Sequence, residues 1–82
     1  MTLSIEARAR IDAQNWAAIA AQFNSPEALA AAIASGEALR WIEDDARIEL
    51  IIDSSMSANE RDEYALVFKR FAMRAICAQI AK

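Results

Sequence analysis

The sequence predicts an all-α fold, and composition and residue spacing both support this. Of its 82 residues, 56% are hydrophobic and 26% are charged, which is typical of one globular domain. Alanine, the strongest intrinsic helix former, is frequent, whereas the chain holds one glycine and one proline. Apolar residues recur at helical spacing along most of the chain. We therefore expect a single domain over residues 1–82, with helices at about 4–23, 26–35, 37–53 and 58–81.

The first helix is predicted by an apolar stripe that Ile19 flanks. The stripe consists of Ile5, Ala9, Trp16, Ala20 and Phe23. Pairs of opposite charge four residues apart indicate the exposed face, and each adds only about 0.2–0.5 kcal/mol. These pairs are Glu6 with Arg10 and Arg8 with Asp12. We expect the apolar stripe to face the core.

The second helix is predicted by its two ends. Ser25 is suited to cap the N-terminus, and Pro26 fits the first helical position, where its missing N–H has no intrahelical partner. Gly36 stands where a helix often ends in the left-handed conformation, which glycine enters without strain at Cβ. The second helix should therefore run from residue 26 to about residue 35.

The third helix is predicted to carry two apolar stripes. One holds Leu39, Ile42, Ala46 and Leu50, and the other holds Trp41, Ile48 and Ile52. The pairs expected on its exposed face are Arg40 with Asp44 and Glu43 with Arg47. Residues 47–52 alternate and are partly β-branched, which favours a strand, but a single strand would lack a pairing partner. We therefore interpret the segment as helical.

The fourth helix begins with a capping box, Ser57 to Glu60, and is apolar around most of its circumference. One face holds Tyr64, Val67, Phe68, Phe71, Ala75 and Ala78, and an adjoining face holds Leu66, Met73, Ile76, Cys77 and Ile80. Such a helix needs neighbours on two sides, and a chain of this length buries only roughly 60–65% of its unfolded surface. We therefore expect a homodimer through this helix, with Tyr64, Phe68, Phe71 and Met73 at the interface. A contribution of the third helix to the same interface stays open.

Acidic residues recur every four positions on the third helix, at Asp45, Glu49 and Asp53, with Asp44 beside them. Three interpretations remain open: a solvated face, a contact for a basic protein partner through Asp45 and Glu49, and a metal site. The metal interpretation is the weakest, because carboxylate sites in helical bundles normally add histidine ligands and the chain has no histidine.

The missing residue types exclude most common catalytic systems. Without histidine there is no Ser–His or Cys–His nucleophile, and one glycine cannot form a glycine-rich phosphate loop. Cys77 is the only cysteine, and its position within an apolar helical face predicts a buried structural thiol. We therefore expect no enzyme activity, no cofactor and no metal.

The net charge of −3 and the pI near 4.8 make nucleic acid an improbable partner. The alternative of a helical DNA-binding regulator would use Arg70 and Arg74, next to Lys69. The N-terminal residues lack the pattern of a secretory signal, no apolar run is long enough to cross a membrane, and no disulfide partner exists for the cysteine. The expected location is the cytoplasm.

No known family has its diagnostic residues in this chain at the right spacing. Residues 42–53, IEDDARIELIID, are similar to an acidic, apolar helix of small phage head–tail connector proteins. That resemblance implies a phage structural or assembly protein as a second alternative. The function expected from the residues themselves is a self-associating adaptor or inhibitor that binds another protein. Its small size and its acidic, cysteine-poor composition are also typical of phage or mobile-element inhibitors.

Overall fold

The computed structural model describes residues 3–52 and 55–81, except for the side chains of residues 49–52. The described residues form four helices: α1 (Ile5–Phe23), α2 (Pro26–Ser35), α3 (Glu37–Ile52) and α4 (Ala58–Ile80). Each predicted helix is confirmed with bounds that differ by at most one residue. The alternative of a strand at residues 47–52 is wrong, because this segment continues α3.

The predicted helix ends are formed by the expected side chains. Ser25 Oγ accepts a hydrogen bond from the N–H of Ala28 at 3.1 Å. In the capping box, Ser57 Oγ accepts from the N–H of Glu60 at 3.2 Å, and the N–H of Ser57 donates to Glu60 Oε1 at 3.0 Å. Gly36 ends α2 with φ of 85°, in the left-handed region. Local chemistry therefore fixes where α2 and α4 begin and where α2 ends.

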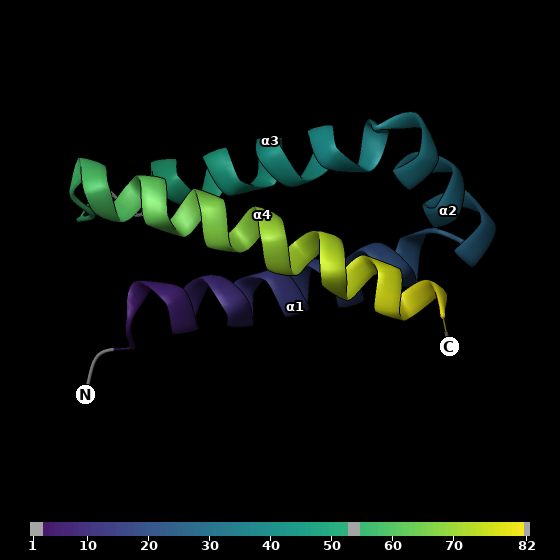
Figure 1. Ribbon diagram of the computed structural model, residues 1–82, viewed down its shortest axis with the longest axis horizontal. Coiled ribbons are helices and arrows are strands. Elements are labelled where there is room, and N and C mark those ends of the chain that lie inside the picture. Colours follow the sequence, from purple (N-terminus) through teal and green to yellow (C-terminus); the bar gives the residue numbers. More distant parts are fainter. Residues whose placement is uncertain (1–2, 53–54, 82) are drawn as a thin grey trace.

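Helix α4 is the central element of the fold (Figure 1). It packs against α1 on one side and against α3 on the other, and α2 contacts α3 and α4 at one end. Among the described residues, α1 and α3 are not a closely packed pair. The Cα trace is only 17 Å thick along its shortest axis, which fits two layers of helices at a usual spacing of about 8–10 Å. One layer is α4, and the other contains α1 and α3.

Helix α1 approaches α4 through small side chains. Ala9, Ala13 and Ala17 are fully buried on α1, as is Ala72 on α4. The predicted core stripe of α1 is therefore partly wrong, because Phe23 is 80% exposed. The alanine face allows the two backbones to come close, and this leaves the bulky residues of α1 beside the contact rather than inside it.

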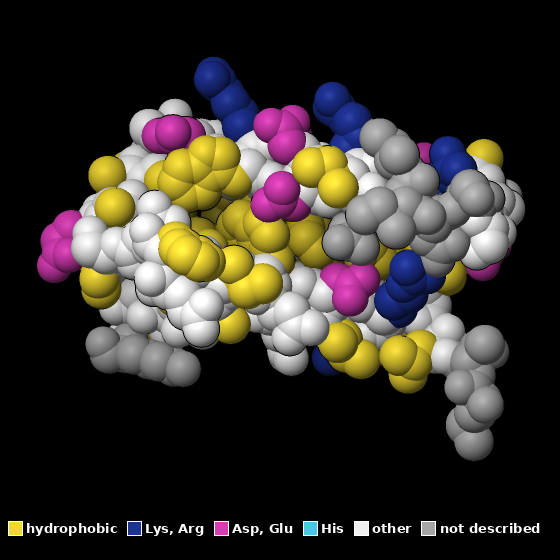
Figure 2. Space-filling view, turned by 180° about the vertical axis from the view of Figure 1, so that it is seen from behind, with side chains coloured by type: hydrophobic (Ala, Val, Ile, Leu, Met, Phe, Trp, Pro, Cys, Tyr) yellow, Lys and Arg dark blue, Asp and Glu magenta, His cyan; other side chains and the backbone are white. Residues whose placement is uncertain are grey.

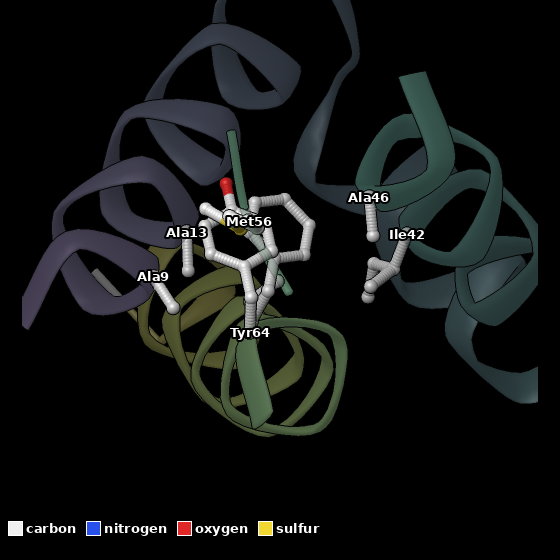
Figure 3. Packing of buried hydrophobic residues seen from close by; sticks show 8 residues of the cluster. Ala9, Ala13, Ile42, Ala46, Met56 and Tyr64 are labelled. Carbon is white, nitrogen blue, oxygen red and sulfur yellow. The ribbon is translucent and has the colours of Figure 1, made fainter. Parts of the chain in front are cut away.

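The centre of the core lies between α1, α3 and α4 (Figure 3). Tyr64 rises from α4 between Ala9 and Ala13 on one side and Ile42 and Ala46 on the other. Its ring stacks on that of Phe68, the next residue along the same face of α4, with a centroid separation of 5.8 Å. Both side chains are only 1% exposed, and together they separate α1 from α3.

The side of α4 that faces away from the core exposes Leu66 and Cys77. The expectation that Cys77 is buried is wrong. Cys77 follows the buried Ile76 by one residue, which turns its side chain about 100° around the helix and out of the core. In the described part of the chain, no helix combines the length and apolar character needed to cross a membrane.

Replacing Ala13 by leucine should lower the free energy of unfolding by about 1–3 kcal/mol, because the added methylenes have no room at the contact between α1 and α4. Urea denaturation followed by circular dichroism measures this change. The matched control is Ala18→Leu, at an exposed position of the same helix, which should leave stability nearly unchanged. Equal destabilisation by both variants would contradict the close helix contact.

Gly36→Ala should lower the free energy of unfolding by about 1 kcal/mol, because an L-residue is strained at this positive φ. No heavy atom lies within 4 Å of an added Cβ, so the loss reports backbone strain and not a clash. Gly36→Asn is the control, because asparagine tolerates the left-handed region better than alanine does. Its free energy of unfolding should lie between those of the wild type and Gly36→Ala. Thermal unfolding should rank the three chains in that order, and a more stable alanine variant would refute it.

Candidate functional site

A groove runs between α1 and α3 on the face opposite α4, and Figure 2 shows this face hollowed and lined by apolar side chains. Two adjoining pockets, of about 270 and 370 Å³, lie along it. We name this feature the α1–α3 groove, and it is formed chiefly by Trp16, Ile19 and Phe23 of α1 and Trp41, Asp45 and Ile48 of α3.

A hydrogen bond crosses the groove and ties its two walls together. The indole N–H of Trp16 on α1 donates to Asp45 Oδ2 on α3. Both residues are half-buried and line both pockets. The carboxylate therefore lies at the junction of the two pockets, between one apolar hollow and the next.

The walls of the groove expose large apolar side chains. Phe23 is 80% exposed, Ile19 is 55% exposed and Ile48 is 52% exposed. The rings of Trp16 and Trp41, both half-buried, continue the same surface. Single exposed apolar residues are common on proteins, but a contiguous apolar patch is typical of an interaction surface.

The groove also carries negative charge. Asp12, at one end, accepts a hydrogen bond from the hydroxyl of Tyr64 at 2.6 Å and lies 4.0 Å from Arg8 Nε. Asp45 accepts from the uncharged indole of Trp16. Among the described residues, neither pocket of the groove is lined by lysine or arginine. A partner entering the groove would thus meet two carboxylates within an apolar surface.

The structure separates the residues that the sequence assigns to an interface. Tyr64 and Phe68 are buried in the core of the chain itself, although Phe68 contributes to the base of one pocket. Asp45 lies in the groove, whereas Phe71 lines a different pocket between α1 and α4. Met73 is half-buried against the core. The side chain of the sixth predicted residue, Glu49, is outside the described residues, and the interface role of the set stays a prediction.

Sequence reasoning missed most of the groove, because Phe23 was expected in a stripe facing the core and the stripe of Trp41 and Ile48 on the third helix was not paired with the first helix. One signal was present for Ile19, which stands beside the main stripe of the first helix and not within it. A second was the position of Phe23 in the last turn before the Asn24-Ser25-Pro26 link, where a helix has fewer neighbours to cover it.

Two of the basic residues considered for DNA binding, Arg74 and Lys69, make other contacts. The guanidinium groups of Arg10 and Arg74 lie 4.8 and 5.3 Å from the ring centroid of Phe71. Lys69 Nζ lies 3.4 Å from Glu43 Oε1, although Arg47 was the expected partner of Glu43. Lys69 is thus paired with the carboxylate of Glu43, and Arg74 lies over the ring of Phe71. The DNA-binding alternative stays a prediction that no described contact favours.

The carboxylates of the third helix do not converge within the described part of the structure. No three histidine, cysteine, aspartate or glutamate side chains approach one another there closely enough to hold a metal ion. The side chain of Glu49 and the whole of Asp53 lie outside the described residues, so the acidic stripe as such is not described.

Comparison of the chain with protein family models, with curated proteins and with solved structures found no match.

Proposed function

We propose that this chain is a non-enzymatic protein-interaction module that receives a partner in the α1–α3 groove. The observation that supports this most directly is the exposure of Phe23, Ile19 and Ile48 along one groove whose base is already apolar. Exposed side chains of this size on one continuous surface favour burial against a second chain.

The exposed apolar side chains of the groove can supply part of the binding free energy of a complex. Burying a phenylalanine or isoleucine side chain contributes about 1.5–3 kcal/mol, and three such residues line the walls. A micromolar complex requires about 8 kcal/mol net of the entropy of association, which is more than these three side chains supply on their own. The two tryptophan rings add further contact surface, and tryptophan is frequent among residues that dominate binding energy.

The residues present support binding more than catalysis. The sequence has no histidine, and the two groove carboxylates, Asp12 and Asp45, each accept a hydrogen bond from an aromatic side chain. The groove is open along its length and lined mainly by apolar groups. A surface of this kind is suited to holding a side chain or a helix of another protein.

Self-association through α4 is a second candidate function, and the exposure of Leu66 favours it. Leu66 is 60% exposed and lines a pocket of about 460 Å³ between α3 and α4. Tyr64 and Phe68 are buried on the inner side of α4, so a partner copy that packs on the outer face of α4 does not reach them. A homodimer would therefore use Leu66 and its surroundings.

Replacing both Ile19 and Phe23 by serine should abolish capture of the natural partner from an extract of the source cells, because the groove loses its exposed anchors. The control is Ile11→Ser, which removes an exposed apolar side chain of α1 outside the groove. Mass spectrometry should find a protein retained by the wild type and by the control but lost with the groove variant. Identical captured proteins for all three chains would contradict the proposal.

If α4 forms a homodimer, sedimentation equilibrium should give twice the chain mass for the wild type and the single mass for Leu66→Glu, because a charge would be desolvated at the contact. Circular dichroism should show unchanged helix content, since Leu66 lies outside the core. Ile11→Glu introduces the same charge on α1 and should stay dimeric. A wild type that remains monomeric at high concentration would exclude this second candidate.

A further inference from the structure

The α1–α3 groove has features that define the chemistry of its occupant. We infer that the occupant is a basic amphipathic helix of another protein, with apolar anchors one helical turn apart and lysine or arginine beside them. This inference rests on the proposed function and specifies the partner class of the same groove.

The spacing of the two pockets sets the spacing of the anchors. The α1 residues that line the pocket of about 270 Å³ run from Asp12 to Ile19, and those that line the pocket of about 370 Å³ run from Trp16 to Phe23. The centres of the two sets are therefore about one helical turn apart along α1. One turn corresponds to about 5.4 Å along the axis. A partner helix lying along the groove would therefore present anchors at positions i and i+3 or i+4, which are neighbours on one helical face.

The walls of the groove favour a helix over an extended strand. Both walls are helices, whose backbone N–H and C=O groups are mostly bonded within the helix and offer no free edge to an added strand. Recognition must then occur through side chains. A helix that enters between α1 and α3 would pack on both walls and on the base that Phe68 of α4 contributes.

The charge of the groove selects a cationic partner. Asp45 stands between the two pockets and accepts a hydrogen bond from the neutral Trp16, and no lysine or arginine among the described residues forms an ion pair with it. A lysine or arginine flanking the anchors could reach this carboxylate in a half-buried setting, where the attraction is stronger than in water. A second copy of this chain fits less well, because its net charge is −3 and two facing grooves would oppose like charges.

The inference can be tested with helical peptides selected from a displayed random library on the immobilised 82-residue chain. The enriched peptides are synthesised and titrated into the protein with tryptophan fluorescence as the readout, because both tryptophans of the chain line the groove. The variants are Phe23→Ser, which removes an exposed anchor, and Asp45→Asn, which keeps an acceptor for Trp16 but removes the charge. Asp62→Asn, at an exposed position of α4, is the matched control for charge.

Enriched peptides should share two apolar residues at i and i+3 or i+4 next to lysine or arginine. Their affinity should fall at least about tenfold with Phe23→Ser and with Asp45→Asn, stay unchanged with Asp62→Asn, and weaken as salt is added. The fluorescence of the protein alone should not change on dilution.

Three results would overturn the inference, and they separate it from the proposed function. Peptides that need Phe23 but are neutral or acidic and bind Asp45→Asn normally would refute the basic partner and leave an interaction groove. A fluorescence change on dilution that Phe23→Ser abolishes would identify a second copy as the occupant. A lack of enrichment, or peptides indifferent to Phe23, would refute both the inference and the proposed function of the groove.

Discussion

The stacked rings of Tyr64 and Phe68 set the distance between α1 and α3. Both rings project from α4 into the layer of the other two long helices, where small alanine side chains make room for them. Protein interiors are close-packed, so large rings on one element require either small residues or a wider spacing on its neighbours. Here the alanines let α1 lie close to α4, and the rings keep α3 away from α1. The groove is the consequence of this distribution of side-chain volume.

The acidic residues of the groove follow from the same aromatic residues. A buried phenol or a half-buried indole needs a hydrogen-bond acceptor, and Asp12 and Asp45 supply acceptors to Tyr64 and Trp16. Each carboxylate therefore has a structural role within the single chain. Since these bonds also hold the carboxylates in place, little side-chain entropy would be lost if the cationic partner proposed above bound there. Stability and recognition would then depend on the same two residues.

The sequence predicts the fold better than it predicts the site. Helix ends were predictable because they depend on nearby residues, as at Ser25, Gly36 and the capping box of Ser57. Burial around each helix was less predictable, because it depends on which neighbour comes closest. Apolar periodicity alone does not distinguish the alanine face of α1, which is buried, from the position of Phe23, which is exposed. The groove arises only when α1 and α3 are placed on α4, so no local pattern identifies it.

The sequence predicts that the last helix exposes apolar side chains. In the described structure most of the exposed large apolar side chains of the helices lie on α1 and α3 instead. Helix α4 is covered by α1 on one side and by α3 on the other, which buries its central aromatic residues. Helix α2 has only 10 residues and packs at one end, so it cannot extend along the open side between α1 and α3. A four-helix bundle places a long helix at that position. The short length of α2 therefore leaves the α1–α3 groove open, and the partner helix proposed above would occupy this groove and not the outer face of α4.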